Sequence, residues 1–285
     1  MAVPNALIVG CGDVGGRLAR QLLDAGWQVS GLRRSVAELP PGVLPIAADL
    51  SDSRCPAAWP SRSPDYLVYC VAASQHDEAG YQVAYVDGLR HVLAWLASHR
   101  QRPRRLLFVS SSSVYAQQDG EWVDERSATV PQGYSGRTML QAERLALDSG
   151  LAGTVVRLTG IYGPGREWLL GQVRQGYRVS EKPPLYGNRI HAEDAAGLLA
   201  FLLQGDARGQ ALQDIYLGVD DDPAPLAEVV AWLRQYLGVS HWSDEQRVRR
   251  TGSKRCSNAR AKALGWAPRY PSYREGYAAI LEGRE

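Results

Sequence analysis

The sequence is poor in the features that mark several large classes of protein. It has four cysteines in 285 residues, and no two of them form a Cys-x-x-Cys pair. This spacing fits neither a zinc ribbon nor a disulfide framework, so we expect reduced thiols, no metal and a cytoplasmic protein. No apolar run reaches the length of about 18 residues that a membrane helix needs, and the first residues lack the basic region of a signal peptide.

Neither sign of charge dominates the sequence. Thirty-two Lys and Arg residues stand against 30 Asp and Glu residues, which leaves a formal net charge of +2. A field this weak offers no general attraction for nucleic acid or for an anionic membrane, so we expect a small-molecule partner. Hydrophobic residues make up 45% of the chain, which is enough for a large buried core.

Short apolar runs alternate with helical patterns through the first half of the chain. Strands are predicted at 6–10, 28–33, 43–50, 65–73, 105–112 and 153–160, and helices near 15–25, 78–99 and 135–149. This alternation is typical of βαβ units, and continuously apolar strands are typical of a parallel sheet that is covered on both faces. We therefore expect an α/β fold with a doubly wound parallel sheet of the Rossmann type.

The pattern changes after Pro164. Residues 166–186 are polar, rich in Gly and Pro and poorly periodic, whereas later residues predict helices at 191–203, 225–237 and 258–266 and a strand at 214–219. We expect residues 1–165 to form a nucleotide-binding core, to which residues 187–205 return. Residues 166–186 and 206–285 are expected to form a smaller C-terminal lobe that binds the substrate.

A glycine-rich turn directly follows the first predicted strand. Gly10, Gly12 and Gly15 form a Gly-x-Gly-x-x-Gly pattern where that strand meets the first helix. Such glycines allow a tight turn, a close approach of the backbone to a diphosphate, and close packing of the helix on the strand. We expect a dinucleotide to bind here, with Asp13 and Val14 among its contacts.

The end of the second predicted strand favours NADP over NAD. An acidic residue at that position would bind the 2′-hydroxyl of the adenosine ribose, but the sequence has Arg33 and Arg34 there. Guanidinium groups suit a 2′-phosphate because each can donate two hydrogen bonds to its oxygens. A solvated pair of loop arginines is the alternative interpretation.

Several motifs, in order along the chain, resemble those of the extended and atypical short-chain dehydrogenase/reductases, the group that contains the NAD-dependent epimerase/dehydratases. AADL with Asp49 resembles the group's acid after the third strand, CVAA at 70–73 its turn beneath the adenine ribose, and RLTGIYGPG at 157–165 its loop on the nicotinamide side. FVSSSSVYA at 108–116 resembles its serine-rich fifth strand. The resemblance implies that the cofactor contacts include Asp49, Leu50, Ala72, Ala73 and Thr159.

The resemblance also implies an enzyme that acts at a carbinol or carbonyl carbon, with nucleotide sugars among the candidate substrates. It implies a homodimer, because two helices of each subunit commonly form a four-helix bundle in this group, here 78–99 and 135–149. In the group a Tyr, and a Lys four residues later, serve proton transfer at the substrate oxygen, and a Ser orients that oxygen. Ser111 matches the Ser position.

The pair of Tyr and Lys is the motif that this sequence does not keep. In PQGYSGRTMLQAE at 131–143, anchoring on the tyrosine pairs Tyr134 with Thr138, whereas anchoring on LQAE puts Ser135 and Met139 at the two positions. Neither register supplies an ammonium group. Without a nearby cation a tyrosine keeps a pKa near its usual value of about 10, which weakens proton transfer at neutral pH.

Further candidates accompany this degenerate motif. Arg137 lies three residues beyond Tyr134, on the same helix face, and is a candidate source of positive charge. Asp87 stands where the group has Asn, and we expect it to anchor the catalytic helix or a water. In this group the C-terminal lobe grips anionic substrates, for which the candidates are Arg249, Arg250, Lys254 and Arg255.

Two functions therefore stay open. The first is an NADP-dependent oxidoreductase/epimerase/dehydratase-like enzyme, with Ser111 orienting the substrate oxygen and Tyr134 as its acid or base. The second is a catalytically inactive protein that senses NADP and binds a partner. A missing Tyr and Lys pair on an intact nucleotide site is what the second function predicts.

Overall fold

The centre of the molecule is a seven-stranded parallel sheet in the order β10-β7-β5-β4-β1-β2-β3. The computed structural model describes residues 3–243 and 252–284. The strands of the sheet are β1 (Asn5–Val9), β2 (Gln28–Arg33), β3 (Leu44–Ala47), β4 (Tyr66–Tyr69), β5 (Arg105–Ser111), β7 (Ala152–Leu158) and β10 (Ile215–Gly218). The predicted doubly wound sheet of the Rossmann type is confirmed.

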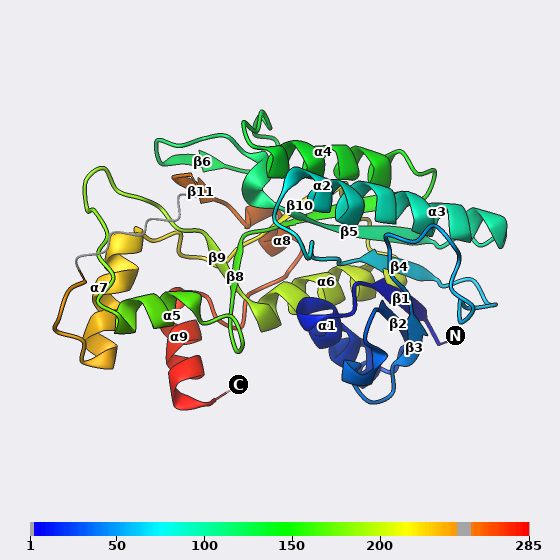
Figure 1. Cartoon of the computed structure of the whole chain (residues 1–285), viewed down its shortest axis with the longest axis horizontal. Coiled ribbons are helices and arrows are strands. Elements are labelled where there is room, and N and C mark those ends of the chain that lie inside the picture. Colours follow the sequence, from blue (N-terminus) through cyan, green and yellow to red (C-terminus); the bar gives the residue numbers. More distant parts are fainter. Residues whose placement is uncertain (1–2, 244–251, 285) are drawn as a thin grey trace.

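Helices cover both faces of this sheet. Figure 1 shows α1 and α6 on one side of the strands and α2, α3 and α4 on the other. These helices are α1 (Asp13–Asp24), α2 (Glu78–Tyr81), α3 (Gly88–Ser98), α4 (Tyr134–Leu147) and α6 (Ala192–Ala207), and a π-helical segment (Gln82–Asp87) joins α2 to α3. Strand side chains alternate between two buried clusters, with Ile8 and Leu107 in one and Leu7 and Leu106 in the other.

The two helical regions expected to build a dimer interface are neighbours on one face of the sheet. The π-helical segment and α3 both pack against α4. Their outer surfaces lie on the same side of the molecule in Figure 1. The homodimer itself stays a prediction.

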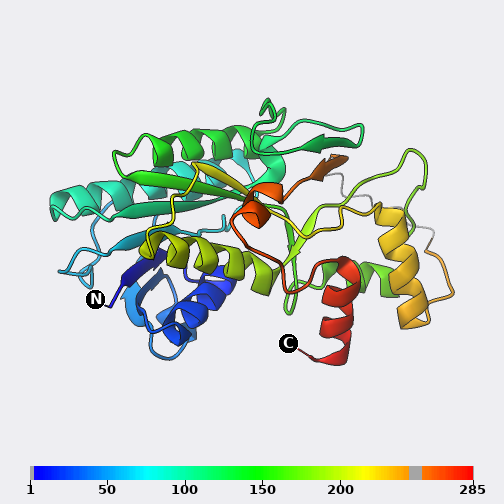
Figure 2. The same ribbon diagram turned by 180° about the vertical axis from the view of Figure 1, so that it is seen from behind.

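A smaller region extends from one end of the sheet. Figure 2 shows its three helices grouped away from the strands. They are α5 (Trp168–Arg174), α7 (Leu226–Leu237) and α9 (Tyr273–Glu282), and they share a separate apolar cluster that includes Leu170, Val229 and Tyr273. The sequence predicted no helix in 166–186, because α5 has only two turns and too few residues to show a helical period.

Two short parallel pairings join distant parts of the chain. They are β6 (Glu121–Val123) with β11 (Lys254–Cys256), and β8 (Gly160–Tyr162) with β9 (Arg189–His191). The remaining elements are α8 (Ala259–Ala263), which packs on β10, and short 3-10 turns at Val36–Glu38 and Ser112–Val114. Since β10 lies in the main sheet, residues 215–218 join the core, although the sequence assigned 206–285 to the lobe. The other boundaries of the core and the lobe stay predictions.

None of the helices within 3–243 and 252–284 combines the length and the apolar character that crossing a membrane requires.

Candidate functional site

A cavity of about 780 Å³ lies along the carboxyl ends of the parallel strands. In doubly wound sheets ligands bind at this edge, where the strand order changes direction. Many residues predicted from the sequence line it, namely Gly10, Gly12, Asp13, Val14, Arg33, Arg34, Asp49, Leu50, Ala72, Ser111 and Thr159. Five of the residues predicted to bind the cofactor or to take part in catalysis are not part of this lining: Gly15, Ala73, Asp87, Tyr134 and Arg137.

The glycines of the turn after β1 have different surroundings. Gly10 has a φ of 86°, and a Cβ added there would lie 2.5 Å from the carbonyl oxygen of Cys70. A Cβ on Gly15 would lie 2.5 Å from the carbonyl oxygen of Gly10, so this glycine lets α1 pack tightly on the turn. Around Gly12 there is no atom within 4 Å of such a Cβ. The turn is therefore closely packed at Gly10 and Gly15 and open at Gly12.

The open side of the turn is suited to an anion. Gly12 is the N-cap of α1 and provides no side-chain acceptor for the first N–H groups of the helix. Those N–H groups, on residues that line the cavity, and the positive end of the helix dipole attract a phosphate. The backbone here thus fits the diphosphate of a dinucleotide.

The far end of the cavity, at β2 and β3, carries the two predicted arginines. Arg33 donates a hydrogen bond to Glu38 and a longer one, at 3.4 Å, to the carbonyl oxygen of Cys11. Arg34 is exposed and forms no ion pair with the rest of the described chain. Arg34 is thus the cation most available to a ligand at this end.

Asp49 lines the same end of the cavity. Hydrogen bonds from the backbone and the hydroxyl of Ser51 hold the pKa of Asp49 below its usual range.

The opposite end, at β5 and β7, is lined by hydroxyl and apolar groups. Ser111 accepts a hydrogen bond from the N–H of Ser113 at 3.2 Å, which begins the 3-10 turn, and its own O–H stays available to a ligand. Thr159 donates to the carbonyl oxygen of Gly218 at 3.1 Å. Burial raises the pKa of Cys70 to about 12, so this lining residue stays a neutral thiol.

The side chain that α4 presents to the cavity is Met139. It is 3% exposed and lines the cavity, whereas Thr138 is buried elsewhere. Tyr134 is the first residue of α4, and its hydroxyl donates to the carbonyl oxygen of His76 outside the cavity lining. The sequence left two registers open. In the register anchored on LQAE, Met139 stands at the Lys position, and Met139 is the residue that lines the cavity. A thioether occupies the place for which the family motif predicts an ammonium.

Arg137 and Asp87 also point to partners outside the cavity lining. Arg137 donates to the carbonyl oxygen of Gln132 at 2.6 Å and lies 3.7 Å from Glu78. Asp87 accepts from Gln82 at 3.2 Å and from Arg90 at 3.0 Å. Neither side chain is brought to Ser111, so their proposed catalytic roles gain no geometric support.

The π-helical segment brings a different residue, Tyr85, into the cavity lining. Its hydroxyl accepts a hydrogen bond from the N–H of Ala73 at 3.3 Å, and burial raises its pKa above the usual value. An extra residue in a helical turn changes which side chains face inward, and such turns are frequent at functional sites. Sequence periodicity alone does not reveal the π-turn, so Tyr85 was missed.

A buried charged network lies directly beneath Ser111 and Met139. Glu143, one turn after Met139 on α4, accepts two hydrogen bonds from Arg157 on β7, at 2.9 Å and 2.7 Å. Ser110, which lines the cavity, also donates to Glu143, at 2.6 Å. The network fixes the wall of the cavity on this side. Its sequence signal is an arginine inside an apolar strand, which was not used as a predictor.

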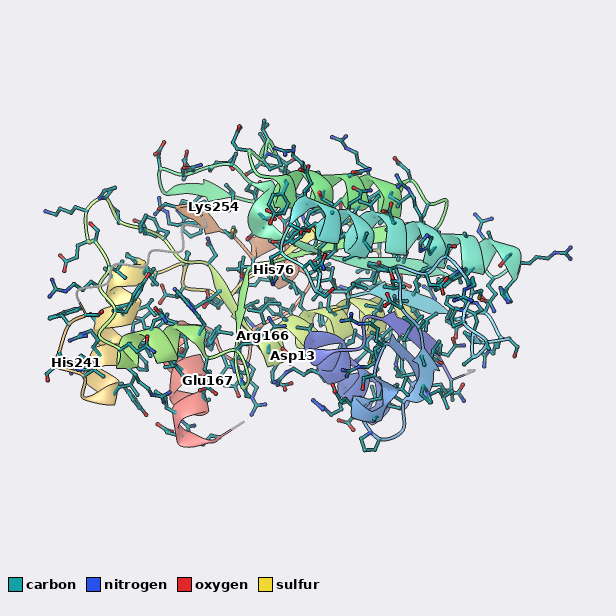
Figure 3. All side chains as sticks on the ribbon, in the orientation of Figure 1. Asp13, His76, Arg166, Glu167, His241 and Lys254 are labelled. Carbon is teal, nitrogen blue, oxygen red and sulfur yellow. The ribbon has the colours of Figure 1, made fainter. Side chains whose placement is uncertain are left out.

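Arg166 crosses the cavity from the smaller region. It follows β8, lines the cavity, and donates a hydrogen bond to the carboxylate of Asp13 at the start of α1. Figure 3 labels both residues, which lie next to each other between the core and the smaller region. No local sequence pattern predicts this contact, because the two residues are 153 positions apart.

The junction near β9 is structural. His191 is fully buried and accepts a hydrogen bond from the N–H of Glu193 at 3.2 Å, which caps α6. Burial lowers the pKa of His191 to about 4, so it stays neutral at neutral pH. Asp194 accepts from the N–H groups of Arg269 at 2.6 Å and Tyr270 at 3.0 Å, and so ties the C-terminal segment to α6.

Of the four basic candidates for an anionic substrate, Arg249 and Arg250 lie outside the described residues. Lys254 is 4% exposed and donates to the carbonyl oxygen of Tyr115 at 3.4 Å. Arg255 donates to the carbonyl oxygen of Gly120 at 2.7 Å. Figure 3 labels Lys254, which is the first residue of β11, and neither Lys254 nor Arg255 lines the cavity. In the part of the chain that the structure describes, no group of His, Cys, Asp and Glu could hold a metal ion.

Known proteins resemble this chain over most of its length. A protein of Streptomyces sp. named 3-diazoavenalumate denitrifying reductase is 29% identical over an alignment of 312 residues, which covers 95% of this chain and 98% of that protein. A structure from Methylobacillus flagellatus, described as a candidate NAD-dependent epimerase/dehydratase, is 34% identical, covers 100% of both chains and has a TM-score of 0.81.

A more distant likeness concerns the fold alone. The UDP-glucose 4-epimerase of Thermotoga maritima, solved with UDP-glucose, is 16% identical with a TM-score of 0.77 over 98% of this chain and 97% of that one. A model of the NAD dependent epimerase/dehydratase family matches residues 6–218, which include all of the seven-stranded sheet except Asn5, the first residue of β1. This chain therefore belongs to the NAD dependent epimerase/dehydratase family.

Proposed function

We propose that this protein is an NADP-dependent oxidoreductase whose substrate binds at the β5 and β7 end of the cavity. One observation carries the proposal: a single cavity joins the glycine turn, the two arginines after β2 and the hydroxyl of Ser111. When bound, the cofactor gives or takes a hydride at its nicotinamide ring.

Different residues of the chain would bind different parts of the cofactor. The turn at Gly10 and Gly12 would hold the diphosphate against the first backbone N–H groups of α1, at Asp13 and Val14. Arg34 would hold the 2′-phosphate, with Arg33 beside it once its bond to Glu38 is shared. Asp49 keeps its negative charge and, with Leu50, would border the adenosine.

At the other end the protein would orient the substrate without a charged proton donor. The hydroxyl of Ser111 would donate to a substrate oxygen, and Met139 would exclude water from the reacting carbon. Tyr85 is better placed than Tyr134 to supply a proton, because it lines the cavity, although burial raises its pKa and makes it a weaker acid. The name of the Streptomyces relative supports a reductase, and the epimerase solved with UDP-glucose keeps nucleotide sugars among the candidate substrates.

A second function is favoured by the thioether of Met139. A cavity that binds NADP without an ammonium beside the reacting carbon also suits a protein that senses the cofactor and carries out no reaction. The sensor and the enzyme share the same nucleotide contacts. They differ in whether a bound substrate changes the cofactor.

Two measurements test the proposal. Calorimetry should give tighter binding of NADPH than of NADH, and Arg34→Ala should weaken NADPH binding about tenfold and leave NADH unchanged, as expected for one charge-assisted contact. Arg54→Ala is the matched control, because Arg54 is exposed, pairs with Asp52 and lies outside the cavity. A preference for NADH would contradict the proposed cofactor.

The second measurement follows the oxidation of NADPH with a panel of aldehydes, ketones and nucleotide sugars. The oxidoreductase is supported if the protein turns over any member of the panel and Met139→Lys changes the rate of that turnover. If NADPH binds tightly and no member of a broad panel is turned over, the sensor is favoured instead.

A further inference from the structure

One cation of the cavity comes from outside the core. Arg166 lies between β8 and α5, at the point where the chain leaves the sheet for the smaller region. Its side chain is 39% exposed, lines the cavity and has one side-chain partner among residues 3–243 and 252–284, the carboxylate of Asp13. An arginine with one partner and an exposed face has donors left for a ligand.

Asp13 is the first residue of α1 and also lines the cavity. Burial favours its neutral acid, but hydrogen bonds from Arg17 and Arg166 outweigh it and hold the pKa of Asp13 below its usual range. The group is therefore a carboxylate at neutral pH, next to the N-terminus of a helix. The carboxylate lies beside the open space at Gly12, where a diphosphate would bind.

The second arginine bound to Asp13 is fixed in place. Arg17 donates to Asp13 at 2.8 Å and also to Glu193 on α6, and its side chain is only 12% exposed. It is not part of the cavity lining. If Arg166 left Asp13, the carboxylate would keep Arg17 as its counter-ion, so the exchange would not leave the charge of Asp13 without a partner.

We propose that Arg166 binds the diphosphate of the dinucleotide and that Asp13 holds it in position until the dinucleotide arrives. This inference rests on the proposed function. A diphosphate carries more negative charge than one carboxylate and accepts the guanidinium fork at two oxygens, so it draws Arg166 away from Asp13. Because Arg166 leads directly into α5, occupancy of the turn would also set the position of the smaller region.

Calorimetry with NADPH and with adenosine 2′-monophosphate tests this role, because the second ligand has the 2′-phosphate but no diphosphate. Arg166→Ala should weaken NADPH binding about tenfold, as expected for the loss of one charge-assisted contact, and leave adenosine 2′-monophosphate unchanged. Asp13→Asn should tighten NADPH binding about threefold, because the competing carboxylate is gone, and by less when Arg166 is also Ala. Arg174→Ala, an exposed residue of α5 outside the cavity, is the control and should change neither affinity.

The outcomes separate this role from the proposed function. If Arg166→Ala binds NADPH like the unchanged protein, or loses both ligands equally while its thermal unfolding is unaltered, Arg166 does not bind the diphosphate. A parent protein that binds adenosine 2′-monophosphate but not NADPH overturns the proposed cofactor together with this role. A parent protein that binds neither ligand overturns the proposed function itself.

Discussion

The guanidinium group of Arg157 holds both carboxylate oxygens of Glu143, at 2.9 Å and 2.7 Å, and each of the two side chains is only 4% exposed. The pair joins β7 to α4 in the wall of the cavity, and Ser110 donates to the same carboxylate. A buried ion pair of this kind is expensive to break, because the partner that remains has no counter-charge.

We therefore expect Glu143→Gln to lower the free energy of unfolding by about 3–5 kcal/mol, since Arg157 would stay charged and buried. Replacing both residues, with Glu143→Leu and Arg157→Met, should cost less than Glu143→Gln alone. Urea denaturation measures both values. The exposed pair of Arg90 and Asp87 is the control, and Arg90→Ala should cost less than about 1 kcal/mol. Equal losses for Glu143→Gln and Arg90→Ala would contradict the prediction.

Gly10 and Gly12 offer a matched pair of substitutions within one turn. Gly12→Ala should leave the free energy of unfolding within about 0.5 kcal/mol, because no atom lies within 4 Å of the added Cβ. It should weaken NADPH binding by about tenfold or more, a loss of about 1.4 kcal/mol, because the Cβ would occupy the space for the diphosphate.

Gly10→Ala, in contrast, should lower the free energy of unfolding. The positive φ and the contact at 2.5 Å with Cys70 should together cost more than about 2 kcal/mol of stability. Thermal unfolding and calorimetry of the two variants check both statements. A Gly12→Ala protein that binds NADPH normally would show that the ligand does not approach this glycine.

Tyr85 and Tyr134 can be separated by removing one oxygen atom from each. Tyr85→Phe should lower NADPH affinity or the turnover number by about three- to tenfold, the range of one hydrogen bond, because Tyr85 lines the cavity. Tyr134→Phe should change neither, because its hydroxyl bonds to His76 outside the lining. The reverse result would restore the role that the sequence first suggested for Tyr134.

Asp220 predicts a pH dependence of stability. It is 2% exposed, and burial, partly offset by Arg189, raises its pKa to about 8. The raised pKa means that the folded state binds this proton more tightly than the unfolded state, so the stabilisation is complete below about pH 4. It is lost as the pH rises toward 8, by up to about 1.4 kcal/mol per pH unit.

The Asp220→Asn variant isolates this effect. Urea denaturation between pH 5 and pH 8 should show the difference in unfolding free energy between parent and variant shrinking or reversing in favour of the variant as the pH rises. His191 has a lowered pKa and affects stability in the opposite direction below about pH 6, but it is present in both proteins and cancels. A difference that does not change with pH would refute the raised pKa.

Much of the core could be predicted from the sequence because the information is local. Continuously apolar strands and the glycine spacing at residues 10–15 each need only neighbouring residues to be recognised. The strand predicted at 105–112 corresponds to β5 (Arg105–Ser111), and the arginines at 33 and 34 line the cavity as expected. These features follow from sequence periodicity and from the place of the turn between β1 and α1.

The catalytic end could not be predicted in the same way, because the face of a helix that meets the sheet depends on where the helix begins. α4 begins at Tyr134 itself, so this residue lies at the helix end, whereas Met139 and Glu143, four residues apart, share the inner face. The π-turn that selects Tyr85 over Asp87 and the contact of Arg166 with Asp13 both depend on tertiary packing. No local pattern encodes them.

The parallel pairing of β6 with β11 joins residues 121–123 to residues 254–256. Contacts between such distant parts of a chain form late, because closing a long loop costs entropy before the contact returns any stability. On the ribosome, the segment after β5 would wait for its partner strand until residues 254–256 had been synthesised. We expect nascent chains to expose that segment until residues 254–256 have emerged.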